Sequence, residues 1–131
     1  MIGILLVTHG SLGESLIQCA CHVLGSRPPL VAQLGVSAHD DPQALEVIAR
    51  QLLKWVDSGE GVIVLTDIYG ATPSNIACRL LEPGRVEGIA GVNLPMLVRA
   101  LTYREKDMAT LVQRTVSGGC EGVLHVQNSS E

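Results

Sequence analysis

The stretch Ile2-Gly3-Ile4-Leu5-Leu6-Val7 is a continuous apolar run that ends at the polar pair Thr8-His9. A run of this kind, without alternation of polar residues, is typical of a strand buried on both faces of a parallel sheet. The next residues, Ser11-Leu12-Gly13-Glu14, have the Ser-x-x-Glu form of a capping box and predict a helix that stops at Gly25. The start of the chain therefore predicts a central strand followed by a helix.

The same order of strand and helix recurs along the chain. Polar residues followed by proline, Asp41-Pro42 and Thr72-Pro73, mark two further helix starts. The pattern predicts strands over 2–7, 30–36, 62–65 and 86–90 and helices over 11–24, 41–56, 72–81, 95–103 and 107–116. Alternating strands and helices with short loops predict an α/β fold, a doubly wound and mostly parallel four-stranded sheet with helices on both faces.

The end of the chain is harder to place. Gly118-Gly119 predicts the end of the last helix, and residues 122–126 predict a last strand. The residues leave open whether this strand runs parallel or antiparallel, and whether it pairs within its own chain. Residues 127–131 form a polar tail.

Composition excludes several functions. The chain has 131 residues, enough for one domain, a net charge of -4, no Phe, and only Trp55, Tyr69 and Tyr103 as aromatic residues. This charge and the scarcity of stacking surfaces disfavour nucleic-acid binding. No apolar run approaches the roughly 18 residues of a membrane span, and the first run is too short for a signal peptide. We therefore expect a soluble, cytoplasmic protein without direct membrane insertion.

Cysteine spacing and motifs exclude further chemistry. Cys19, Cys21, Cys78 and Cys120 form no C-x-x-C pair, so reduced thiols and no metal site are expected. No Walker loop, G-x-G-x-x-G, G-x-S-x-G or H-E-x-x-H motif occurs, so nucleotide hydrolysis, dinucleotide binding, serine hydrolysis and zinc proteolysis lack support. No cofactor is expected.

Two polar residues stand directly after predicted strands, where open α/β sheets bind ligands. His9 follows the first strand and precedes a helix N-terminus, which favours an anion. Asp67 follows the third strand. In a sheet where the first and third strands are neighbours, its carboxylate could accept a hydrogen bond from one ring nitrogen of His9 and leave the other as a nucleophile. The loop Gly70-Ala71-Thr72-Pro73 adds a hydroxyl and a second helix N-terminus. These residues suit phosphoryl transfer, which depends on positioning and charge stabilisation.

Each residue also has a purely structural interpretation. His9 could simply end a strand, Asp67 could belong to a turn, and Thr72 could cap a helix. For the other histidines, His22, His39 and His125, a structural role is the better interpretation.

Three segments together resemble a known family. Leu6-Val7-Thr8-His9-Gly10, Thr66-Asp67-Ile68-Tyr69-Gly70-Ala71-Thr72-Pro73-Ser74-Asn75 and Ala90-Gly91-Val92-Asn93-Leu94-Pro95-Met96-Leu97 occur in this order. The chain thereby resembles the enzyme IIA domain of the mannose family of the bacterial phosphoenolpyruvate-dependent sugar phosphotransferase system (PTS). The resemblance covers residues 1–126, nearly the whole chain.

The resemblance implies a function for each site residue. His9 would take a phosphoryl group on Nε2 from the phosphocarrier protein HPr and pass it to an enzyme IIB, with Asp67 holding the other ring nitrogen. Thr72, where the family usually has Ser, would contact the phosphoryl group together with Gly10, Gly70 and Ala71. The family also forms homodimers that exchange the C-terminal strand, which implies an antiparallel, exchanged strand at 122–126.

The chain stops at residue 131 without a IIB domain, so we expect the phosphoryl acceptor to be a separate protein.

Three other roles remain open. A stand-alone IIA could instead be regulatory, with protein contacts that depend on phosphorylation of His9. A phosphotransfer subunit for a dihydroxyacetone kinase has a similar fold, but the run Asn93-Leu94-Pro95-Met96 favours the mannose type. A small-molecule enzyme has no further motif to support it.

Overall fold

The computed structural model of the chain describes residues 1–128, so the last three residues of the predicted polar tail lie outside the described residues. The strands are β1 (Gly3–His9), β2 (Val31–Val36), β3 (Val62–Thr66) and β4 (Val86–Ala90). The helices are α1 (Leu12–Leu24), α2 (Pro42–Val56), α3 (Thr72–Leu80), α4 (Leu94–Tyr103) and α5 (Met108–Glu121).

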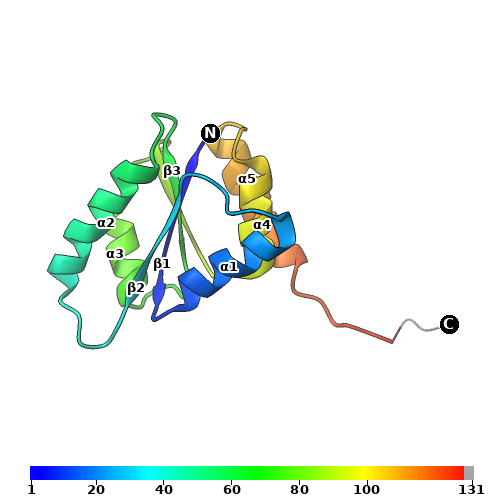
Figure 1. Cartoon of the computed structure of the whole chain (residues 1–131), viewed down its shortest axis with the longest axis horizontal. Helices are drawn as coiled ribbons and strands as arrows, with labels where there is room; N and C mark the ends of the chain where they lie inside the picture. The colour runs from blue at the N-terminus through cyan, green and yellow to red at the C-terminus, as the bar shows by residue number, and fades with distance from the viewer. Residues whose placement is uncertain (129–131) are drawn as a thin grey trace.

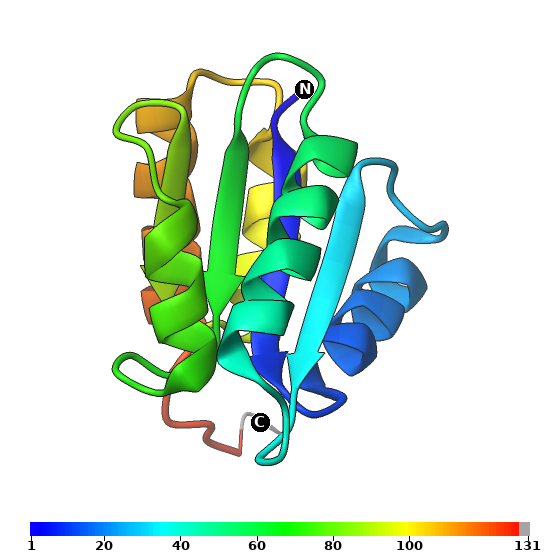
Figure 2. The ribbon, with the colours of Figure 1, turned by 90° about the vertical axis from the view of Figure 1, so that its left-hand side faces the viewer.

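The four strands form one parallel sheet in the order β2-β1-β3-β4. Helices α2 and α3 cover one face, and α1, α4 and α5 cover the other (Figures 1 and 2). The predicted doubly wound α/β fold is therefore confirmed. In the sheet register, Val7 of β1 lies opposite Leu34 of β2 and Thr66 of β3. The carboxyl ends of β1 and β3 consequently lie side by side.

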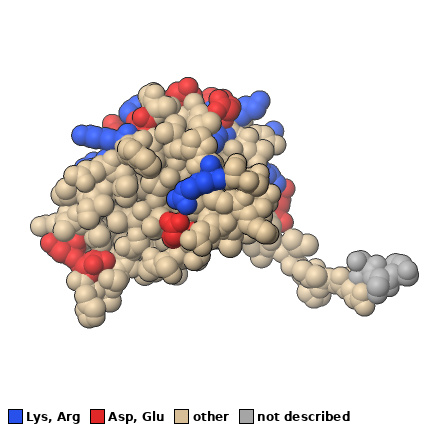
Figure 3. Space-filling model, in the orientation of Figure 1, with Lys and Arg blue, Asp and Glu red and all other residues tan. Residues whose placement is uncertain are grey.

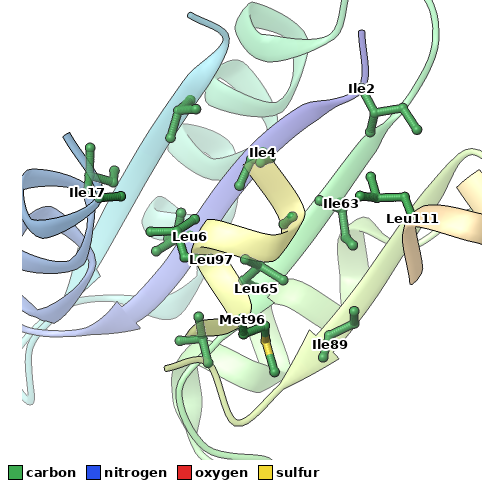
Figure 4. Close-up of a cluster of buried hydrophobic side chains, with 14 residues drawn as sticks. Ile2, Ile4, Leu6, Ile17, Ile63, Leu65, Ile89, Met96, Leu97 and Leu111 are labelled. Carbon is green, nitrogen blue, oxygen red and sulfur yellow. The ribbon is translucent and has the colours of Figure 1, made fainter. Parts of the chain in front are cut away.

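Alternate residues of the central strand supply two separate cores. Ile4 and Leu6 of β1 pack with Leu97 of α4 and Leu111 of α5 (Figure 4). Leu5 and Val7 pack instead with α2 and α3 on the opposite face. Because both faces of β1 are covered, its apolar residues are fully buried, which explains why the run is continuous rather than alternating.

Two of the predicted helix caps are wrong. Ser11 stands at the N-cap position of α1, but its backbone is not extended and its side chain makes no cap hydrogen bond, so the predicted capping box is absent. The hydroxyl of Thr8, at the end of β1, accepts the hydrogen bond from the Gly13 backbone N–H instead, at 2.8 Å. Thr72 is the first residue of α3, and Ala71 occupies the cap position before it. At α2 the prediction is confirmed, since the Asp41 side chain accepts from the Gln43 backbone N–H.

The end of the chain also differs from the prediction. Gly118 and Gly119 do not end the last helix, because α5 continues to Glu121. A Cβ on Gly118 would lie 2.6 Å from Cβ of Arg99, and one on Gly119 would lie 2.7 Å from Cε of Met96. These glycines therefore allow α5 to pack closely against α4. Residues 122–126 form no strand in the single chain, and this segment leads away from the body of the fold (Figure 1).

A buried arginine directly after α4 contacts the segments that precede β1 and β2. Arg104 is 3 % exposed and donates hydrogen bonds to three carbonyl oxygens, those of Ile2, Pro29 and Leu30, at 2.9, 2.6 and 2.8 Å. Burial lowers the pKa of Arg104, and the charge of Glu105 partly offsets this. Arginine nevertheless stays protonated in proteins. Its guanidinium therefore binds the starts of both β1 and β2.

Candidate functional site

The two residues singled out after the strands meet at the carboxyl edge of the sheet. His9 is the last residue of β1, and Asp67 directly follows β3. Oδ2 of Asp67 lies 2.9 Å from the backbone nitrogen of His9 and 2.9 Å from its ring Nδ1. The predicted contact between these two side chains is therefore present, and it follows from the adjacency of β1 and β3 in the sheet.

The charge of Asp67 determines which ring nitrogen of His9 is available. Burial raises the pKa of the Asp67 carboxyl, but hydrogen bonds from the backbone and ring of His9 outweigh it and lower the pKa below its usual value. An ionised carboxylate only accepts hydrogen bonds, so Nδ1 of His9 must carry the proton in this contact. Nε2 of the neutral ring then holds a free lone pair. The His9 side chain is 52 % exposed, whereas that of Asp67 is only 12 % exposed.

The turn after His9 is held tightly against β2. Gly10 has a positive φ of 54°, and its backbone N–H donates to the carbonyl oxygen of Val36 at 2.8 Å. A Cβ on Gly35 of β2 would lie 2.2 Å from the carbonyl oxygen of Gly10. Only glycine at position 35 therefore lets the turn that carries His9 lie where it does.

Sequence reasoning missed two residues that position this turn, Gly35 and Thr8. A lone glycine inside a predicted strand is a signal of close backbone approach, and Gly35 carries that signal. Thr8 has no comparable signal, because its role as the cap of α1 depends on the three-dimensional position of β1.

The loop after Asp67 carries the other predicted site residues. The backbone N–H of Ile68 donates to Oδ1 of Asp67 at 3.0 Å, so both carboxylate oxygens are engaged. Gly70 has a φ of 91°, Ala71 caps α3, and the exposed Thr72 begins it. All three residues thus lie at the same edge of the sheet as His9. The N–H of Gly10 is already bonded to Val36, so in this structure it is not available to an anion.

The loop that follows β2 carries exposed acidic residues. Asp40 and Asp41 are exposed in the loop between β2 and α2, and the exposed His39 precedes them. On the face shown in Figure 3, acidic side chains gather at the amino-terminal end of α2 without basic side chains beside them. Arg79 of α3 pairs with Glu46 and lines one pocket together with Asp41 and Thr72, so charges of both signs lie near Thr72.

The fold and the site together define an open α/β protein with an exposed histidine, oriented by an aspartate, at the carboxyl ends of its strands. The chain belongs to the family described as PTS system fructose IIA component, whose model matches residues 3–116. The resemblance to the mannose-family IIA domain is thereby confirmed. Membership supports a IIA phosphotransfer role in the sugar-transporting phosphotransferase system.

Relatives of known name agree with this assignment. The chain is 36 % identical over 125 residues to the mannose-specific EIIAB component of Escherichia coli K12, covering 93 % of this chain and 38 % of that protein. It is 32 % identical over 106 residues to the fructose-specific EIIA component of Bacillus subtilis, covering 80 % of this chain and 72 % of that protein. The chain therefore spans well under half the length of the EIIAB relative.

Solved structures share the fold. The mannose/sorbose-specific IIA subunit of Enterococcus faecalis superimposes with a TM-score of 0.87 at 21 % identity, over 99 % of this chain and 98 % of that one. The IIA protein associated with the fucose utilization operon of Streptococcus pneumoniae gives a TM-score of 0.82 at 25 % identity, over 94 % and 91 %. Within residues 1–128, no helix is long and apolar enough to span a membrane.

Proposed function

We propose that this chain, as one IIA domain over residues 1–126, carries a phosphoryl group on Nε2 of His9. The proposal rests on the contact of ring Nδ1 with the ionised Asp67, since this contact leaves the lone pair on Nε2 of a side chain that is 52 % exposed. In the cytoplasm, HPr would be the phosphoryl donor and an enzyme IIB the acceptor, and no cofactor is required.

The contacts suggest how each residue acts. As Nε2 forms its bond to phosphorus, the bond from phosphorus to the donor breaks and the imidazole ring gains positive charge. Asp67 stabilises that charge through Nδ1–H, at a distance of 2.9 Å. The hydroxyl of Thr72 and the backbone N–H groups of Gly70 and Ala71 are the proposed donors to the phosphoryl oxygens, because they stand at the start of α3.

We also propose that the protein is a homodimer in which residues 122–126 pair with a second copy. Val123, Leu124 and Val126 are 76, 69 and 81 % exposed, which is unfavourable for apolar side chains in water. Strand β4 is an edge strand of the sheet and can accept an additional strand. Analytical ultracentrifugation of the full chain tests this: we expect a dimer that Leu124→Asp weakens, and a wild-type monomer at high concentration would contradict it.

Phosphate incorporation tests the carrier function directly. The chain is incubated with phosphoenolpyruvate, enzyme I and HPr, and the acid-labile phosphate is mapped by mass spectrometry. We expect one phosphoryl group on His9 and none in His9→Gln. The matched control is His39→Gln, which removes an exposed histidine near the same edge and should leave incorporation unchanged. Incorporation into His9→Gln would overturn the proposal.

The acceptor is tested in the next step. A purified phosphorylated chain is mixed with a candidate IIB protein or with a dihydroxyacetone kinase, and loss of label from His9 is followed. Transfer to IIB alone supports the proposed place in sugar uptake. Transfer to the kinase alone, or partner binding that depends on phosphorylation without transfer, would replace it with one of the other roles.

A further inference from the structure

A pocket of about 120 Å³ lies between α3 and the edge of the sheet formed by β3 and β4. Tyr69, Cys78, Leu81 and Gly88 are its exposed lining residues, so they form its mouth. The remaining lining residues come from the two strands and from α3, namely Val64, Thr66, Ser74, Ala77, Ile89 and Ala90. None of them is Asp, Glu, Lys, Arg or His, so the lining carries no formal charge at neutral pH.

One polar group in this pocket lacks a partner. Thr66 is 4 % exposed, and its hydroxyl oxygen is buried without a hydrogen-bond partner. Val62 and Val64 of the same strand pack in the core on the α2 and α3 face, so alternation along β3 directs the Thr66 side chain to that face as well. Buried hydroxyls are normally hydrogen-bonded, because leaving one unpaired costs free energy.

We propose that this pocket binds a small uncharged molecule with an apolar body and a single hydroxyl, which hydrogen-bonds to Thr66. The pocket is smaller than the roughly 150 Å³ cavity that accommodates benzene, so the apolar body of such a ligand would extend through the exposed mouth. A charged ligand is disfavoured because the apolar walls offer nothing to neutralise it. A sugar is disfavoured because most of its hydroxyls would face Val64, Ala77 and other apolar groups.

The pocket adjoins the site of His9 without being part of it. Thr66 directly precedes Asp67, and Tyr69 belongs to the loop that follows Asp67. Ser74, which is 2 % exposed, lies two residues after Thr72 in the first turn of α3. A bound molecule would therefore touch the segment that holds Asp67 and Thr72 from its inner side. The binding itself does not depend on the proposed phosphoryl transfer.

Phenol is the probe, and it is titrated into the full-length, isotope-labelled chain while amide shifts are followed by NMR. We expect shifts centred on Thr66, Ala77 and Gly88. Thr66→Val keeps the shape of the side chain but removes the hydroxyl, so it should weaken phenol binding about three- to tenfold, the worth of one hydrogen bond. Benzene, which has no hydroxyl, should bind wild type and Thr66→Val with similar affinity.

A second variant tests the location. Ala90→Leu fills the pocket from the end of β4 and should abolish the phenol shifts in a protein that still unfolds cooperatively. Phenol binding that Thr66→Val leaves unchanged, or the absence of shifts at pocket residues, would overturn the proposal. Pocket residues that shift on dilution from dimer to monomer, but not with phenol, would show that a second copy fills the pocket, which would also overturn it.

Discussion

Oδ2 of Asp67 lies 2.9 Å from both the backbone nitrogen and Nδ1 of His9, so one carboxylate oxygen holds the residue and orients its ring. Asp67→Asn keeps the size of the side chain but loses the charge. We expect the rate of phosphoryl acceptance on His9 to fall about 10- to 150-fold, the worth of a hydrogen bond to a charged group. Initial rates with phosphorylated HPr measure this.

The control for Asp67→Asn is Asp41→Asn, which removes a charge from the same edge and keeps the cap of α2. It should change the rate much less. Equal effects of the two variants would mean that net charge at this edge, and not the contact with His9, sets the rate.

The lowered pKa of Asp67 predicts how stability depends on pH. In the unfolded chain an aspartate has a pKa of about 3.9, so it takes up a proton before the folded protein does as the pH falls. The stability that Asp67 contributes is therefore complete above about pH 5 and is lost as the pH falls through the lower, folded pKa. Urea unfolding of wild type and Asp67→Asn should show a difference in unfolding free energy that shrinks below pH 5. A difference that stays constant down to pH 2 would contradict this.

Gly35→Ala tests the close approach beneath the turn of His9. Because its Cβ would lie 2.2 Å from the carbonyl oxygen of Gly10, the turn must move. We expect the unfolding free energy to fall by about 1–3 kcal/mol and phosphoryl acceptance to fall with it. Gly88→Ala is the control, since its Cβ meets only the flexible end of Leu81, at 3.0 Å. Normal acceptance by Gly35→Ala would show that the turn tolerates displacement.

The substitution Arg104→Lys keeps the positive charge, but a lysine ammonium group cannot donate to the carbonyl oxygens of Ile2, Pro29 and Leu30 at once as the guanidinium does. We expect a loss of about 2–4 kcal/mol of unfolding free energy, because buried carbonyl groups lose their donors. Arg114→Lys is the control: its guanidinium carbon lies 5.3 Å from the centre of the Tyr103 ring and is worth less than about 1 kcal/mol. Chemical denaturation compares the two variants, and equal losses would refute a special role for Arg104.

The sheet and the central pair of site residues could be predicted from the sequence because their signals are local. The continuous apolar runs before Thr8 and Thr66 indicate buried parallel strands, and each run ends just before a polar site residue. Adjacency of β1 and β3 then brings His9 and Asp67 together.

What could not be predicted depends on contacts between distant segments. Gly118-Gly119 has the composition of a helix end, but the packing of α5 against α4 keeps it helical. The cap of α1 comes from Thr8 on the preceding strand, so a motif confined to Ser11–Glu14 could not show it. Arg104 has no sequence signal at all, since its acceptors lie 74 to 102 residues away.

The central place of β1 has a consequence for the order of events during synthesis. Strand β1 needs β2 on one side and β3 on the other, and the residue before it also binds the guanidinium of Arg104. Ile2 therefore gains its last partner only after the next 102 residues have been made. The apolar run Ile2–Val7 therefore stays incompletely paired until Arg104 has been made, and we expect chaperones to retain nascent chains truncated before Arg104 more than longer ones.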